Sequence, residues 1–179
     1  MKNIGFTYNS KICVSCGGCQ VACQSSHGLN ADEFFRRVVI ASDEEGQSHA
    51  YSGSCNHCEQ PACVDACPTG AMYVDEKEGV VLHDDGICIG CGCCVWNCPY
   101  GSVSISLKKG VSQKCDSCIE RRSEGLAPYC VAACPMNAIG WRDQEEGEGW
   151  ERLSAPFLPS SDITLPTTLA KFRRGGEEK

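Results

Sequence analysis

The chain has 179 residues, of which 17 are cysteine, and a formal net charge of −7. With only three Trp, five Tyr and five Phe, its apolar core would be thin for this length, so disulfides or metals are expected to hold the fold together. The acidic balance excludes nucleic acid and an anionic membrane surface as natural partners. No apolar run approaches the roughly 18 residues that span a bilayer, so any membrane anchor would be another subunit.

Residues 4–12 alternate loosely between apolar and polar side chains and predict a short strand. The strand leads into the first cysteine motif, Cys13-x₂-Cys16-x₂-Cys19-x₃-Cys23, which is followed by Gln24. Residues 21–29 predict a brief helix. Residues 30–54 are expected to form a linker whose apolar patch, between Phe34 and Ile40, is a strand packed on the core.

The second motif is Cys55-x₂-Cys58-x₄-Cys63-x₃-Cys67-Pro68, and residues 69–82 after it predict a β-hairpin with its turn at 75–79. The third motif is Cys88-x₂-Cys91-x₂-Cys94-x₃-Cys98-Pro99. Its spacing reproduces the C-x₂-C-x₂-C-x₃-C-P run of bacterial ferredoxins, in which the fourth cysteine binds a neighbouring cluster. Residues 103–107 then predict a strand and residues 108–110 a turn.

The fourth motif is Cys115-x₂-Cys118-x₁₁-Cys130-x₃-Cys134-Pro135, and its insert, 119–129, predicts a short helix and a loop. Residues 137–141 predict the last strand. An acidic surface turn is expected at 143–151. From Leu153 onward no helical or strand period is visible, so the tail is expected to be extended, either disordered or laid along a partner subunit.

The cysteine count favours iron–sulfur clusters over disulfides or zinc. The count is odd, and sixteen cysteines fall into four tight groups of four. The first ten residues also lack the apolar core of a signal peptide. In a two-cluster ferredoxin module, each motif gives three cysteines to one cluster and the fourth to the other. Four motifs therefore predict two modules and four clusters. From spacing alone, the motifs can pair either in sequence order or in a nested arrangement.

The run from Cys55 to Met72, with Cys88–Cys91, Cys98–Gly101 and Lys114–Cys118, resembles the iron–sulfur electron-transfer subunit of the dimethyl sulfoxide reductase (molybdopterin oxidoreductase) family. The resemblance implies an α+β fold of two nested bacterial-ferredoxin-like modules with short strands and helices. Residues 1–30 and 108–142 would form module one, around the first and fourth motifs. Residues 31–107 would form a linker and the inserted module two, and residues 143–179 an acidic turn and an extended partner-binding arm.

The resemblance also implies the ligands of four [4Fe–4S] clusters. The four sets are Cys13, Cys16, Cys19 and Cys134; Cys23, Cys115, Cys118 and Cys130; Cys55, Cys58, Cys63 and Cys98; and Cys67, Cys88, Cys91 and Cys94. Cys93 is left over, and we expect it to be a small buried side chain without a ligand role.

The function implied is that of a non-catalytic subunit. Such a subunit carries electrons between a quinone-linked membrane subunit or a soluble donor and a large molybdenum- or tungsten-pterin catalytic subunit. The alternative is a soluble polyferredoxin or a carrier of the hydrogenase or formate-lyase type. The chain would be cytoplasmic, or exported together with a partner that bears a twin-arginine signal.

Three further residues inside the motifs are candidate neighbours of the clusters. Trp96 is expected to shield a cluster from water, and Lys114 is expected either to tune a cluster or to lie at the surface. His57 is expected to be a surface group. No nucleophile–base pair, histidine metal motif or glycine-rich phosphate loop is present, so the chain is not expected to be an enzyme on its own.

Overall fold

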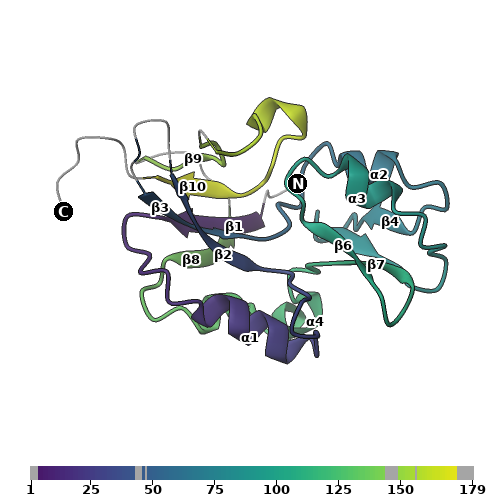
Figure 1. The fold of residues 1–179 in the computed structure, drawn as a ribbon, viewed down its shortest axis with the longest axis horizontal. Coiled ribbons are helices and arrows are strands. Elements are labelled where there is room, and N and C mark those ends of the chain that lie inside the picture. Colours follow the sequence, from purple (N-terminus) through teal and green to yellow (C-terminus); the bar gives the residue numbers. More distant parts are fainter. Residues whose placement is uncertain (1–3, 43–45, 47, 144–148, 156, 173–179) are drawn as a thin grey trace.

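The computed structural model describes residues 4–42, 46, 48–143, 149–155 and 157–172, and it is built from short helices and strands (Figure 1). The strands are β1 (Ile4–Asn9), β2 (Arg37–Ser42), β3 (Ser48–Gly53), β4 (Met72–Val74), β5 (Val81–His83), β6 (Val103–Ser106), β7 (Val111–Lys114), β8 (Ile139–Asp143), β9 (Glu151–Arg152) and β10 (Leu169–Lys171). The helices are α1 (Gly18–Ser26), α2 (Ala62–Asp65), α3 (Cys93–Asn97), α4 (Ile119–Ser123), α5 (Tyr129–Ala132) and the 3₁₀ turn η1 (Ser161–Ile163). The predicted α+β class is confirmed. In this part of the chain no helix is long and apolar enough to cross a membrane.

The largest sheet has the order β8-β1-β10-β9. Strand β1 runs antiparallel to β8 and parallel to β10, so the N-terminal strand lies at the centre of this sheet. Phe6 in β1 is in register with Trp141 in β8, and their rings meet edge to face with centroids 4.7 Å apart. The strands predicted near the start of the chain and at 137–141 are therefore both confirmed, although β8 is not the last strand.

The other described strands form three antiparallel hairpins, which pair β2 with β3, β4 with β5 and β6 with β7. The hairpin predicted over 69–82 is confirmed as β4 and β5, and the strand predicted over 103–107 is β6. The apolar patch before the second motif does form a strand, β2. However, Val39 and Ile40 in β2 are 46% and 69% exposed, so the prediction that this patch packs on the core was wrong for these two side chains.

The helices that carry the cysteine motifs pack in a nested order. Helix α1 of the first motif packs against α5 of the fourth, and α2 of the second packs against α3 of the third. In Figure 1 the elements from α2 to β7 gather at one end of the molecule, α1 and the large sheet lie toward the other, and α4 lies between them. Arg122 in α4 joins the two ends through an ion pair of 2.8 Å with Glu78, in the turn between β4 and β5.

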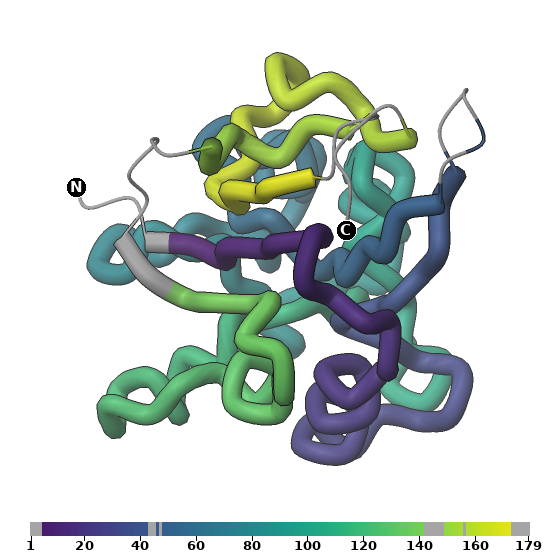
Figure 2. Tube along the Cα trace, turned by 90° about the vertical axis from the view of Figure 1, so that its left-hand side faces the viewer, coloured from purple at the N-terminus to yellow at the C-terminus, as the bar shows by residue number. Residues whose placement is uncertain are grey.

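The C-terminal segment folds back onto the rest of the chain. Strand β10 runs beside β1, as Figure 2 shows, and Leu153 is completely buried. The prediction of a tail without helix or strand from Leu153 onward was therefore wrong for η1 and β10, and β9 begins at Glu151, the last residue of the predicted acidic turn. These elements are two or three residues long, and long-range pairing rather than a local period defines them. The acidic turn predicted at 143–151 falls mostly outside the described residues.

Candidate metal centres

All four cysteine motifs share one backbone feature near their start. The residue just before the second cysteine has a positive φ in each motif, a region that side-chain-bearing residues rarely adopt. These residues are Ser15 (φ 55°), His57 (φ 44°), Gly90 (φ 67°) and Ser117 (φ 60°). Such a turn forms a concavity of backbone N–H groups, which suits a negatively charged cluster. The repeat seen in the cysteine spacing is thus also a repeat in three dimensions.

Gly90 is the one loop position of these four where a side chain is sterically excluded. A Cβ built there would lie 2.2 Å from the carbonyl oxygen of Gly110. Gly101 also has a positive φ, but a Cβ there would meet nothing within 4 Å. An alanine at Gly90 would meet both a steric clash and an unfavourable φ angle, whereas an alanine at Gly101 would meet only the unfavourable φ angle. Comparing the two substitutions therefore isolates the effect of the clash.

We expect Gly90→Ala to disrupt the loop between Cys88 and Cys91 and to lower the iron content of the purified protein. The reason is that the Gly110 backbone must move to admit the methyl group. Gly101→Ala should cost only about 1 kcal/mol, from backbone strain, and should leave the iron content unchanged. Iron analysis of both variants tests this, and equal iron content would contradict the account.

The first group of sulfurs surrounds a small cavity. Cys13, Cys16, Cys19 and Cys134 all line it, together with apolar side chains that include Val38 and Ile139. Cys134 accepts a hydrogen bond of 3.2 Å from the backbone N–H of Ala138. The structure therefore brings the fourth cysteine of the last motif to the first three cysteines of the sequence.

The second group lies in the interior and contains Cys23, Cys115, Cys118 and Cys130, all of them buried. Burial raises the pKa of Cys130, and the neighbouring Cys23 and Cys118 raise it further. Burial also raises the pKa of Cys115, and the next contributions come from Cys23 and Cys55. Cys115 also lies in one buried cluster with Cys130 of its own group and with Cys55 of the third group.

The third group joins the second motif to the end of the third. Burial, the largest cause, and the neighbouring Cys55, Cys98 and Cys58 together raise the pKa of Cys63 to about 12. Burial, again the largest cause, together with Cys55 and Cys98 raises the pKa of Cys58 to about 11. Cys98 accepts a hydrogen bond of 3.4 Å from the N–H of Ser102.

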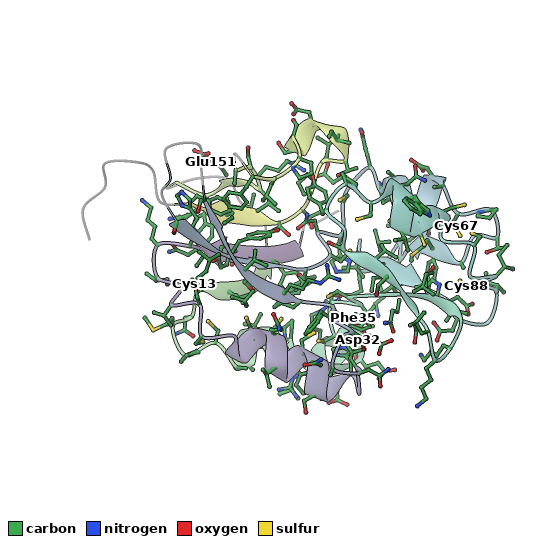
Figure 3. The ribbon with its side chains drawn as sticks, viewed as in Figure 1. Cys13, Asp32, Phe35, Cys67, Cys88 and Glu151 are labelled. Carbon is green, nitrogen blue, oxygen red and sulfur yellow. The ribbon has the colours of Figure 1, made fainter. Side chains whose placement is uncertain are left out.

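The fourth group lies at the far end of the molecule. Burial raises the pKa of Cys94, and the neighbouring Cys67 raises it as well. The Ser112 hydroxyl lies 3.0 Å from the Cys94 sulfur. The same hydroxyl lies 3.9 Å from Cys88, and Cys67 accepts from the N–H of Met72 at 3.4 Å. In Figure 3, Cys67 and Cys88 lie at the end of the long axis opposite Cys13.

These sulfurs have the chemistry that iron–sulfur clusters require. All seventeen cysteines are described and none is in a disulfide. A cluster ligand must be a thiolate, yet burial raises the pKa of thiols such as Cys63 and Cys58 to about 12 and about 11. A bound cation removes this conflict, and soft thiolates arranged in groups select iron–sulfur clusters. The residues therefore fit such a group.

Two predictions about cluster neighbours are corrected. Trp96 is 88% exposed, so it does not shield a cluster within this chain. His57 is 1% exposed rather than at the surface, and its Nδ1 accepts a hydrogen bond of 3.2 Å from the N–H of Val81. Burial and the nearby charge of Lys114 lower its pKa well below the usual range, so the imidazole is neutral.

Lys114 lies in the interior, between the two ends of the molecule. Only 6% of the residue is exposed, and its Nζ donates to the carbonyl oxygens of Val81 and of Cys115, the latter at 2.8 Å. Its positive charge lowers the pKa of Cys63, against the larger effect of burial. This position fits the predicted tuning role of Lys114 and excludes the surface role. Cys93 is half-buried and lies beside Cys91. A hydrogen bond between the two side chains raises the pKa of Cys93.

Two side chains beside the sulfurs were not predicted from the sequence. His27 Nδ1 lies 2.8 Å from the carbonyl oxygen of Cys23, and His27 Nε2 lies 3.4 Å from Asp116 and 4.0 Å from the sulfur of Cys118. The signal was the missing proline after Cys23, because without it α1 continues and carries His27 to this place. The other side chain, Arg36, is buried near three cysteines, and no motif marks it.

Comparison with known proteins agrees with this geometry. Residues 47–144 match the family model of the 4Fe-4S dicluster domain. The sequence is 36% identical to a chain of the anaerobic dimethyl sulfoxide reductase of Haemophilus influenzae over 186 residues, covering 96% of this chain and 90% of the relative. It is 37% identical to the corresponding chain of the enzyme from Escherichia coli strain K12, covering 93% and 87%. It is 34% identical to a subunit of the sulfite dehydrogenase of Allochromatium vinosum, covering 77% and 68%.

The protein belongs to the family of iron–sulfur subunits of dimethyl sulfoxide reductase. As a member of this family it binds [4Fe–4S] clusters, and it is an electron-transfer subunit of an oxidoreductase complex rather than a catalyst on its own. These relatives favour the electron-transfer subunit over a soluble polyferredoxin, which was the alternative.

Proposed function

We propose that this electron-transfer subunit holds four [4Fe–4S] clusters in two nested modules. The ligand sets are the four groups of sulfurs described above, with Cys93 outside them. The packing of α1 on α5 and of α2 on α3 supports the nested pairing over pairing in sequence order. The module boundaries would be 1–30 with 108–142 for one module, and 31–107 for the linker and the other.

The observation that best supports a wire is the distribution of sulfur exposure. Cys16, in the first group, and Cys91, in the fourth, are the exposed cysteines, whereas the second group is entirely buried. When bound, the clusters supply a series of one-electron carriers. The protein contributes an accessible sulfur at each end, burial between the ends, and a short path where Cys115 approaches Cys55.

The partner we propose is a large catalytic subunit with a molybdenum- or tungsten-pterin cofactor, and in addition a membrane subunit that exchanges electrons with quinone. The names of the relatives, dimethyl sulfoxide reductase and sulfite dehydrogenase, favour a catalytic partner that acts on a sulfur compound. The Cys16 end would face the catalytic subunit and the Cys91 end the electron donor. Export with a twin-arginine partner would place the complex outside the cytoplasm.

Replacing Cys91 by serine tests this direction. In the complex co-purified with its large subunit, Cys91→Ser should abolish turnover driven by the quinone-side donor. It should spare turnover with artificial dyes that reduce the catalytic subunit directly, because only the donor end of the wire is broken. The matched variant is Cys16→Ser, at the opposite exposed end.

Cys16→Ser should also block donor-driven turnover, but through the cluster next to the catalytic subunit. Titration with the quinone-side donor should then still reduce the Cys91-end cluster in Cys16→Ser. The same donor should reduce no cluster in Cys91→Ser. The reverse pattern would contradict the proposed direction, and failure of a large pterin subunit to co-purify would contradict the proposed partner.

A further inference from the structure

Arg36 is a buried cation at the junction of the sulfur groups. It is 3% exposed and lies just before β2, and its side chain turns inward while that of Arg37 is exposed. Its Nη1 donates to the carbonyl oxygen and the hydroxyl of Ser52, at 2.9 and 3.1 Å, and its Nη2 donates to the hydroxyl of Ser54 at 2.8 Å. The guanidinium also lies over the ring of Phe6, 4.7 Å from its centroid.

No carboxylate neutralises this charge among the described residues, whose ion pairs all involve other groups. The Nε of Arg36 is buried and has no hydrogen-bond partner. A buried charge is costly unless it is paired, and the serine oxygens that Arg36 contacts are neutral. A counter-charge of another kind is therefore expected near Arg36.

The anionic groups that act on Arg36 are cysteine sulfurs from two different groups. The Ser52 hydroxyl that accepts from Arg36 lies 3.3 Å from the sulfur of Cys19. Burial opposes the charged guanidinium, yet Cys130, Cys115 and Cys19 together raise the pKa of Arg36. In return, the charge of Arg36 lowers the pKa of Cys130. Cys19 belongs to the first sulfur group, and Cys115 and Cys130 belong to the second.

We propose that Arg36 is the shared counter-charge of the clusters held by the first and second sulfur groups, and that it raises the reduction potential of both. This inference rests on the proposed ligand sets. Reduction adds one electron to a ligand set whose net charge is already negative, and no bond to Arg36 forms or breaks. A fixed positive charge in a low-dielectric interior stabilises the added electron. Arg36 thus acts on electron transfer through the clusters, by its charge, and not by contact with a substrate.

The experiment is a redox titration of the full chain with dithionite, followed by electron paramagnetic resonance, on anaerobically prepared protein. Arg36→Gln removes the charge, Arg36→Lys retains it, and Arg37→Gln removes the neighbouring exposed charge as the matched control. Each titration component is assigned by its disappearance in one of four variants, one from each sulfur group: Cys16→Ser, Cys118→Ser, Cys58→Ser and Cys91→Ser. Iron analysis accompanies every variant.

In Arg36→Gln we expect the equilibrium constant for one-electron reduction to fall by about tenfold, or about 59 mV, for the first two sulfur groups, with the other two unchanged. Arg36→Lys should restore most of the difference, and Arg37→Gln should shift nothing. Unchanged potentials in an Arg36→Gln protein with full iron would overturn the inference. A wild-type protein with fewer than four clusters would instead overturn the proposed function.

If Arg36→Gln fails to assemble its clusters, two further variants show whether the protein needs the charge of Arg36 or only its packing. These variants are Arg36→Lys, which keeps the charge, and Arg36→Met, which removes it. If the lysine variant assembles its clusters and the glutamine and methionine variants do not, the charge is required, as proposed. If the lysine variant fails as well, or if the methionine variant assembles with wild-type potentials, the role of Arg36 is packing alone and the inference is wrong.

Discussion

Replacing Cys94 by alanine should lower the iron content from about sixteen to about twelve atoms per polypeptide, because one four-iron cluster loses a buried ligand. Cys94 is buried with Ser112 and Cys67 beside it, which marks it as part of the fourth sulfur group. The measurement is iron and acid-labile sulfide per polypeptide on anaerobically purified protein. A residual three-iron cluster, with about fifteen iron atoms, would still identify Cys94 as a ligand.

The neighbouring Cys93 provides the matched control. It has the same side chain one position earlier in the sequence and lies outside the proposed ligand sets. Cys93→Ala should therefore retain about sixteen iron atoms and an unchanged electron paramagnetic resonance spectrum. If Cys93→Ala lost a cluster and Cys94→Ala did not, the ligand assignment in the third motif would have to be exchanged.

Ending the chain after Trp150 should remove the cluster of the third sulfur group, because the C-terminal segment holds the loop from Cys55 to Cys58 in place. Glu59 and Gln60 donate backbone hydrogen bonds to the carbonyl oxygens of Leu165 and Thr164. Thr167 donates from its hydroxyl to the carbonyl oxygen of Asn56 at 2.7 Å. Thr168 donates to the Asn56 side chain at 2.9 Å. All of these contacts would be lost.

The truncation also removes buried apolar side chains. Leu153 and Leu169 are 0% and 3% exposed, and each contributes about 2 kcal/mol through burial. Thermal cluster loss, followed by absorbance, should therefore begin at a lower temperature. A protein ending at Phe172 keeps every described contact of the segment and should behave as the wild type. If the protein ending at Trp150 kept its full iron content and stability, the bracing role would be contradicted.

The metal chemistry of this protein could be predicted from the sequence because it is local. A quartet of cysteines with short, repeated spacing places three sulfurs on one loop, and this arrangement does not depend on how the rest of the chain folds. The nested pairing could not be predicted in this way. It depends on which short helices pack together, and the spacing of Cys67 and Cys98 fits either pairing. Only the resemblance to the dimethyl sulfoxide reductase family selected one of them.

The errors share a physical cause, since each concerned the burial of a side chain or the pairing of a strand, and distant segments of the chain determine both. His57 was expected at the surface, but it is buried beside Val81, from a strand 24 positions later. Trp96 was expected to shield a cluster from water, but its side chain on α3 is exposed. The tail was expected to be extended because β9 and β10 are too short to show a period. Their pairing with each other, and that of β10 with β1, defines them.

Arg36 illustrates the same limit at the site itself. Two adjacent arginines in a linker are typical of a solvent-exposed pair. Nothing in the sequence indicates that one of the two side chains is buried and the other exposed. Only the fold places Arg36 against Phe6 and Ser52 while leaving Arg37 exposed. A role in setting cluster potentials therefore became visible only with the structure.

The most direct test of the four-cluster account is native mass spectrometry of the full chain, purified and ionised without oxygen. The account predicts the mass of the polypeptide plus four [4Fe–4S] clusters, with about sixteen iron atoms bound through sixteen cysteines. A fully loaded species with three clusters or fewer, or with zinc in place of iron, would contradict it.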